Sequence, residues 1–247
     1  DGYIIPKNDA YFSEYSSPDR LKILTNFSGS AGFAIILKNE NYLFVDGRYT
    51  IQAQIQSGKY FKIIEVPKFS AKHILKKTKK ILSLGFDPKL FTNLSLKRKF
   101  AKNFNLVPIT ENLIDKIYKD KSKKTISSFY NLDNKITGET ASSKINRLIK
   151  IMKSKKIHNI FISASENVAW LLNIRGKDNP NSPIPNCKII LTNTKKIFFF
   201  SCPKKINIIK KHHEHKKIIF CTYLDFSKII NKLKGSNFSI DSSTCSV

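Results

Sequence analysis

The feature that most constrains the fold of this chain is an internal repeat. Three strings of the first half recur in the second half, in the same order and with similar polarity. The pairs are Asp1–Pro6 with His158–Ser163, Leu24–Gly29 with Leu171–Gly176, and Phe33–Leu37 with Cys187–Leu191. Short apolar runs bounded by turn residues predict strands, and apolar residues at helical spacing between them predict helices. We therefore expect two copies of one α/β unit.

The repeat also predicts how the chain divides into domains. A length of 247 residues suits two domains of ordinary size. The charged run Lys119–Lys124 and the Asp-, Asn- and Thr-rich run Leu132–Thr140 are typical of a linker. We place the first domain at residues 1–120, the linker at 121–139 and the second domain at 140–247.

The two copies differ at their beginnings. The second copy opens with a helix that begins after Thr140 or Ser142, because Ile145, Leu148, Ile149 and Met152 recur at helical spacing. The first copy begins directly with its strand. A strand without a covering helix would leave apolar surface exposed. We therefore expect that an opening helix naturally covers this strand as well, and that this helix is missing from the chain.

The net charge of +26 raises the question of a nucleic-acid partner. Only five of the 44 basic residues are Arg, whereas Lys, Ile and Asn are abundant throughout. Nucleic-acid surfaces usually depend on Arg for bidentate contacts with phosphates and bases. The composition thus favours a general bias toward Lys, Ile and Asn along the whole chain. A Lys-rich nucleic-acid-binding module remains the alternative.

Other compositional features narrow the class of protein. No apolar run approaches the roughly 20 residues that a membrane span needs, so we expect no membrane partner. Four cysteines lie at uneven spacing, without a Cys-x-x-Cys pair, in the last quarter of the chain. This pattern predicts reduced thiols and a cytoplasmic protein.

Two glycine-containing loops in the first half are candidate sites. Gly29 and Gly32 precede a strand, whereas a phosphate-binding loop follows a strand and opens a helix. We interpret these two residues as allowing close approach of the backbone. Asp46, Gly47 and Arg48 end one strand and open a helix. Asp46 is expected to cap that helix and Gly47 to permit a turn that a side chain would forbid, while Arg48 is expected to pair with Asp46 or with Asp19.

The second half offers three further candidates near a predicted helix at 166–173. Trp170 is expected to anchor the core. Asn173 and Arg175 follow at the end of this helix, just before a Pro-rich loop, where an interdomain or substrate-edge role is open; Trp170 shares that candidacy. The cluster His212–His215 lacks the His-Glu-x-x-His spacing and has Lys on both sides, so we assign it no metal. We find no catalytic constellation in the sequence.

At this point the strings resemble a known family. Asn26–Gly32, Asp46–Tyr49 with Gln52-Ala53, and Asn112–Tyr118 look like the N-terminal domain of aminopeptidase P, the Xaa-Pro aminopeptidases. Glu166–Asp178 with Asn181–Pro183 resembles the middle domain of the long, three-domain form of this family. Departures are small: Lys177 stands where Ser is more usual, and Ser182 interrupts an Asn-Pro pair.

The resemblance implies two tandem creatinase N-terminal-like domains, each a mixed β-sheet flanked by helices. It implies a parent enzyme that releases the N-terminal residue of peptides with proline in second position, using two manganese ions or similar metals in a pita-bread catalytic domain. We expect that domain to be absent here, the second domain to be incomplete at its end, and the chain to be inactive alone. The expected partners are its own catalytic domain and proline-containing peptides, with a homodimer left open. A free-standing interaction protein is a further alternative.

Overall fold

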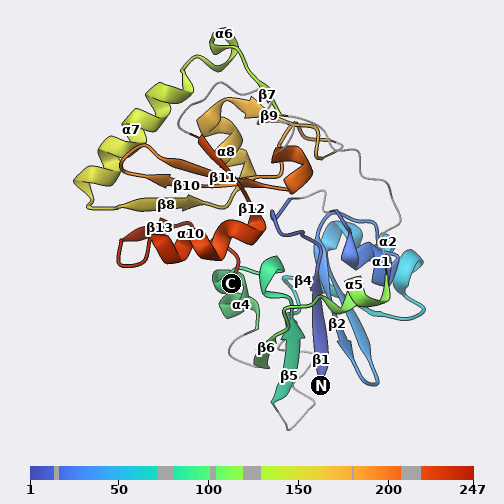
Figure 1. The fold of residues 1–247 in the computed structure, drawn as a ribbon. Coiled ribbons are helices and arrows are strands. Elements are labelled where there is room, and N and C mark those ends of the chain that lie inside the picture. Colours follow the sequence, from blue (N-terminus) through green and yellow to red (C-terminus); the bar gives the residue numbers. More distant parts are fainter. Residues whose placement is uncertain (14–16, 72–80, 101–103, 119–128, 180, 207–217) are drawn as a thin grey trace. The chain divides into compact units, whose positions relative to one another are not determined.

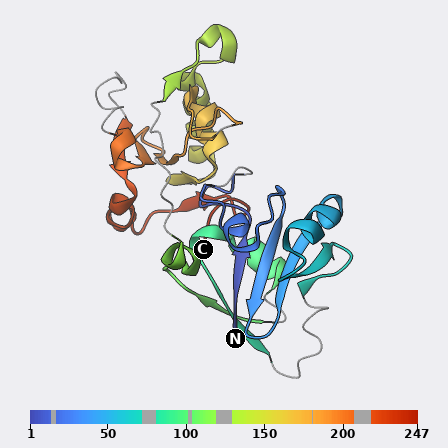
Figure 2. The same ribbon diagram turned by 90° about the vertical axis from the view of Figure 1, so that its right-hand side faces the viewer.

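The computed structural model describes residues 1–13, 17–71, 81–100, 104–118, 129–179, 181–206 and 218–247. They form two compact units, Asp1–Ser122 with Ser246–Val247, and Lys123–Cys245. Figures 1 and 2 show the two units in views 90° apart. Among the described residues, no helix combines the length and the apolar character that crossing a bilayer demands.

The first unit is built on a mixed sheet of six strands in the order β4-β3-β2-β1-β5-β6. Its strands are β1 (Gly2–Pro6), β2 (Gly32–Leu37), β3 (Asn41–Asp46), β4 (Lys62–Val66), β5 (Leu82–Phe86) and β6 (Phe104–Pro108). The pairs β1–β2 and β2–β3 are antiparallel, and the pairs β3–β4, β1–β5 and β5–β6 are parallel. The described helices include α1 (Arg20–Thr25), α2 (Thr50–Ser57), α4 (Asn93–Lys99) and α5 (Leu113–Ile117).

The second unit is built on a five-stranded sheet in the order β12-β11-β10-β8-β13. Its strands are β8 (Asn159–Ile162), β10 (Lys188–Thr192), β11 (Ile197–Ser201), β12 (Ile218–Thr222) and β13 (Phe238–Ile240). Helices α7 (Ala141–Ser154) and α8 (Ser165–Leu172) pack on one face, and α10 (Phe226–Lys232) packs on the other (Figure 1). The predicted cap of α7 is confirmed, since the Thr140 hydroxyl accepts a hydrogen bond from the Ser143 amide.

The two sheets share one topology, which confirms the predicted duplication. Strands β1, β2, β3, β4 and β5 correspond to β8, β10, β11, β12 and β13, with the same parallel or antiparallel pairing at each step. The turns also correspond, because Asn26 after α1 and Asn173 after α8 both have left-handed backbone, with φ of 64° and 54°.

One predicted match is wrong by one residue. Tyr3 pairs with Ile36 in the first sheet, and the equivalent Ile160 pairs with Leu191 in the second. Leu191 therefore corresponds to Ile36 and not to Leu37. A shift of one residue exchanges the two faces of a strand. With the corrected match, Ala34 and Ile189 both face the side of the sheet that α1 or α8 covers.

The first strand is buried on both faces of the sheet. Tyr3, Ile4 and Ile5 are all buried, with Ile4 in the core on one face and Tyr3 and Ile5 in the core on the other. Ile114 of α5 joins the latter core, and α5 contacts α1. In the second unit α7 contacts α8, the counterpart of α1. In the described part of the first unit, α5, which follows the last strand of the sheet, helps to cover this face.

Several predicted boundaries need correction. Apolar residues at helical spacing predict a helix over 94–104, but α4 ends at Lys99 and Phe104 begins β6. The segment 121–139, predicted as a linker, contains β7 (Tyr130–Asn131) and α6 (Asn134–Thr137), and β7 pairs with β9 (Ile174–Arg175) of the second unit. Three segments lie outside the described residues: 119–128, the His-rich cluster at 212–215, and most of a Lys-rich helix that the apolar spacing predicts over 71–82.

Candidate functional site

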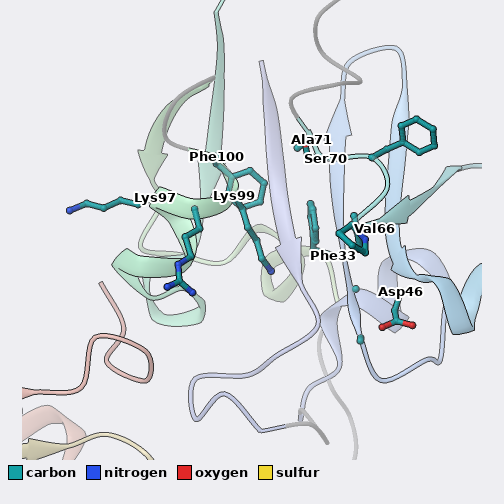
Figure 3. A pocket seen from close by; sticks show the side chains of 13 residues that line it. Phe33, Asp46, Val66, Ser70, Ala71, Lys97, Lys99 and Phe100 are labelled. Atoms are coloured by element: carbon teal, nitrogen blue, oxygen red, sulfur yellow. The ribbon is translucent and has the colours of Figure 1, made fainter.

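A pocket of about 770 Å³ opens at one edge of the first unit's sheet (Figure 3). The parallel strands β3 and β4 end there at Asp46 and Val66, and the antiparallel β2 begins there at Gly32. The carboxyl ends of parallel strands are a common location for binding sites in α/β sheets. The end of α4 supplies another side of the pocket. The lining residues are Ala31, Gly32, Phe33, Asp46, Val66, Pro67, Phe69, Ser70, Ala71, Lys97, Arg98, Lys99 and Phe100.

Aromatic rings build the apolar part of this pocket. The Phe33 ring stacks on the Phe44 ring at a centroid distance of 4.4 Å. The Phe100 ring meets Phe33 edge to face at 5.5 Å. Both arrangements are the favourable geometries for aromatic pairs. Because Phe33, Phe44 and Phe100 are all buried, the base of the pocket is fixed by the core itself.

The charges around the pocket are unbalanced. Asp46 accepts hydrogen bonds from the Arg48 amide and the Arg48 Nε, both at 2.9 Å, and these bonds lower the pKa of its carboxyl group. Of the two predicted partners, Arg48 pairs with Asp46, whereas Asp19 pairs with Lys7. Lys97, Arg98 and Lys99 line the opposite side, and within the described residues none of the three forms an ion pair.

Lys99 differs from Lys97 in its direction. Figure 3 shows Lys99 reaching toward Phe33, whereas Lys97 points away from the other labelled side chains. The Lys99 Nζ lies 5.3 Å from the centroid of the Phe33 ring, within reach of a cation–π interaction. The Lys99 residue is exposed overall, and desolvation by the surrounding protein lowers the pKa of its ammonium group.

The glycines of the first unit have different reasons to be glycine. A Cβ atom on Gly32 would lie 2.7 Å from the Phe44 carbonyl oxygen, and one on Gly29 would lie 2.2 Å from the Phe27 ring. At both positions the backbone lies too close to a neighbouring group to leave room for a side chain. Gly47 does not fit its predicted role, because its φ is not left-handed and its Cβ would meet only the flexible Glu65 side chain, at 3.3 Å. This turn would accept a side chain.

In the second unit, Asn173 is part of a buried polar cluster. Its Oδ1 accepts a hydrogen bond from the Lys144 Nζ at 2.7 Å, and its Nδ2 donates to the Glu139 carbonyl at 2.8 Å and to the Thr137 hydroxyl at 3.1 Å. The Lys144 Nζ also donates to the Trp170 carbonyl at 2.8 Å. Asn173 thus ties α7 and the segment before it to the end of α8.

Lys144 is a member of this cluster that the sequence motifs do not single out. It is buried, and desolvation lowers the pKa of its ammonium group. The available signal is its position, since Lys144 lies four residues before Leu148 and eight before Met152, on the apolar face of α7. A lysine on that face needs acceptors inside the protein, and the end of α8 provides them.

Trp170 and Arg175 lie beside this cluster. Trp170 is 52% exposed, so its predicted role as a core anchor is wrong. The Lys144 Nζ lies 4.3 Å from the centroid of the Trp170 indole ring, within reach of a cation–π interaction. The Arg175 Nη1 donates to the Ile174 carbonyl at 2.8 Å and to the Ala169 carbonyl at 3.2 Å, which satisfies backbone at the end of α8.

The described residues do not offer a metal centre. Across the described ranges, no three His, Cys, Asp or Glu side chains converge on one point. A pair of divalent ions needs several carboxylate or imidazole ligands. The side chains that the structure describes would not hold a pair of manganese ions, which the resemblance assigns to the separate catalytic domain.

The chain consists of two α/β domains in tandem whose sheets share the order and pairing of five strands. The family model described as "Creatinase/Prolidase N-terminal domain" matches residues 1–117, and a second model of the same description matches residues 120–247. The chain belongs to the creatinase/prolidase N-terminal domain family and carries two of its domains.

Relatives with established names are similar over most of this chain. A "Probable Xaa-Pro aminopeptidase P" of Laccaria bicolor is 31% identical over 225 residues, which are 86% of this chain and 35% of that protein. An "Aminopeptidase P1" of Lotus japonicus is 30% identical over 230 residues, which are 88% of this chain and 34% of that protein. The chain thus spans about a third of the length of the curated relatives that it matches.

A solved structure shows the same arrangement of elements. It is described as X-prolyl aminopeptidase from Caenorhabditis elegans, "a cytosolic enzyme with a di-nuclear active site". The match has a TM-score of 0.83 at 30% identity and covers 94% of this chain and 40% of that one. Both domains of this chain therefore have counterparts in the structure of the Caenorhabditis elegans X-prolyl aminopeptidase.

Proposed function

We propose that this chain is the non-catalytic front region of a Xaa-Pro aminopeptidase, where its two domains shape the access of peptides to a catalytic domain. One observation supports this most: the structural match to the Caenorhabditis elegans enzyme extends over 94% of this chain but only 40% of the enzyme. In this proposal the bond-breaking chemistry lies in the catalytic domain of the longer enzyme, and the lack of convergent metal ligands among the described residues is consistent with that assignment.

The proposal includes the expected cofactor, location and partners. Two divalent metal ions, manganese by expectation, would activate water in that catalytic domain. The cytosolic description of the Caenorhabditis elegans enzyme supports a cytoplasmic location. Trp170, Asn173 and Arg175 would act at the edge of the second domain. The bonds of Asn173 within that domain support a positioning role for it, and the exposed Trp170 ring is the group among them best placed to touch a partner or a peptide.

The test compares the chain alone with the longer product of its gene. The purified 247-residue chain, supplied with manganese and a tripeptide with proline in second position, should release no N-terminal residue. The same chain continued by the coding sequence that follows it should cleave the tripeptide. Cleavage by the chain alone, or a longer product that neither binds metal nor cleaves, would overturn the proposal.

A further inference from the structure

We propose that the pocket of the first unit binds an organic carboxylate that carries an apolar or aromatic group, as the C-terminal residue of a peptide does. The pocket is formed by residues of that unit alone. The inference therefore does not depend on the proposed aminopeptidase role, and its test needs no turnover.

The size and walls of the pocket fit a small ligand with an apolar body. Its volume of about 770 Å³ lies within the range of roughly 300–1,000 Å³ typical of small-molecule sites. Five of its lining side chains are apolar rings or branched groups: Phe33, Val66, Pro67, Phe69 and Phe100. Two of them, Phe33 and Phe100, are held by aromatic packing, so this surface is formed before any ligand arrives.

The charge of the pocket selects an anion. The single carboxylate of the lining, Asp46, is already held by Arg48, whereas Lys97, Arg98 and Lys99 have no ion-pair partner in the described part of the chain. A ligand carboxylate would supply the missing negative charge, and charge-assisted hydrogen bonds are about twice as strong as neutral ones.

Lys99 is the cation best placed to contact such a ligand. Its ammonium lies over the Phe33 ring, at the junction between the charged side and the apolar base of the pocket (Figure 3). Desolvation already lowers its pKa, so a carboxylate beside it would relieve an existing cost. Free phosphate would gain the charge but could not use the apolar walls, which distinguishes the two anions.

The experiment uses the 247-residue chain and three probes: N-acetyl-phenylalanine, its neutral amide, and inorganic phosphate. Titrations followed by NMR should show that the carboxylate binds about tenfold more tightly than the amide and more tightly than phosphate. The backbone amides of Gly32, Val66 and Ser70 should shift with the carboxylate. Equal binding of acid and amide, tighter binding of phosphate, shifts confined to other residues, or no binding at all would each overturn the proposal.

Two lysines of α4 provide a matched pair of variants. Lys99→Met should weaken binding of N-acetyl-phenylalanine about tenfold, and Lys99→Arg should retain most of it. Lys97→Met removes the same charge from the same helix, but its side chain points away, so it should weaken binding less than about twofold. Equal losses in the two Met variants would show a general charge effect and reject the assignment. If Lys99→Met does not fold, the comparison of acid and amide on the unaltered chain still decides the question.

Discussion

Replacing Asp178 with Asn should destabilise the second unit severely, because it breaks a buried ion pair. The Lys205 side chain is 2% exposed and its partner Asp178 is 13% exposed. The Lys205 Nζ also lies 4.4 Å from the centroid of the Phe129 ring, and Asp178 accepts a hydrogen bond from the Asn186 amide at 2.6 Å. The Asn variant keeps the size of the side chain and an acceptor for Asn186 but leaves the Lys205 charge without a counterion.

The expected loss follows from this burial. Removing one partner of a buried ion pair typically costs about 3–5 kcal/mol, and the acceptor that Asn retains places the expectation near 3 kcal/mol. The matched control is the exposed pair Arg147–Glu139 of the same unit, whose side chains are 59% and 31% exposed. Arg147→Met should cost less than about 1 kcal/mol, because exposed ion pairs are screened by water.

Urea unfolding measures both variants with one signal. Trp170 is the single tryptophan of the chain and lies in the second unit, so its fluorescence reports the unfolding of that unit. Asp178→Asn should lower the urea midpoint strongly with little change in slope. If Asp178→Asn lowers the free energy of unfolding no more than Arg147→Met does, burial does not determine how much the Asp178–Lys205 pair contributes to stability, and the reasoning is refuted.

Three further outcomes are expected. Lys144→Met should lower the free energy of unfolding in urea by about 1–3 kcal/mol, because it leaves the Asn173 Oδ1 without a donor. Lys150→Met, on the exposed face of α7, should change it little, and equal losses in the two variants would contradict this. Burial raises the pKa of Tyr3 and of Tyr42 to about 12, so both stay protonated in the folded chain after an unfolded tyrosine has ionised. Stability should therefore fall as the pH rises from about 10 to about 12, and Tyr3→Phe should reduce that slope in a pH series of unfolding curves. Burial also raises the pKa of the Cys187 thiol. A thiol reagent should therefore label the exposed Cys202 rapidly and Cys187 only on unfolding, as measured by mass spectrometry of the labelled peptides. Rapid labelling of Cys187 in the folded chain would disprove its burial.

The duplication is accessible from the sequence because it rests on backbone geometry that few residues satisfy. Asn26 and Asn173 both occupy the left-handed position at the end of a helix, where Asn and Gly are favoured. The exact register is not accessible in this way. β2 and β10 are buried on both faces, so their apolar runs do not alternate and a shift of one residue leaves no trace in the pattern.

The wrong predictions have a common physical cause, because tertiary contacts override the general preferences of residue types. Tryptophan usually lies in a core, but Trp170 lies over a buried lysine and stays half exposed. Phe100 and Phe104 have helical spacing, although Phe104 begins β6. The pocket of the first unit leaves no local signal either. Its lining comes from segments up to 69 residues apart, from Ala31 to Phe100, and only the folded sheet brings them together.

The paired asparagines show how two copies of one architecture can diverge while their backbones stay alike. In the first copy Asn26 faces solvent and serves the geometry of its turn. In the second copy the same position has turned inward, and its amide joins three separate stretches of polypeptide. The same left-handed turn thus forms an exposed bend in one copy and a polar anchor in the other. The lysine contact of the second copy requires no change of main-chain conformation.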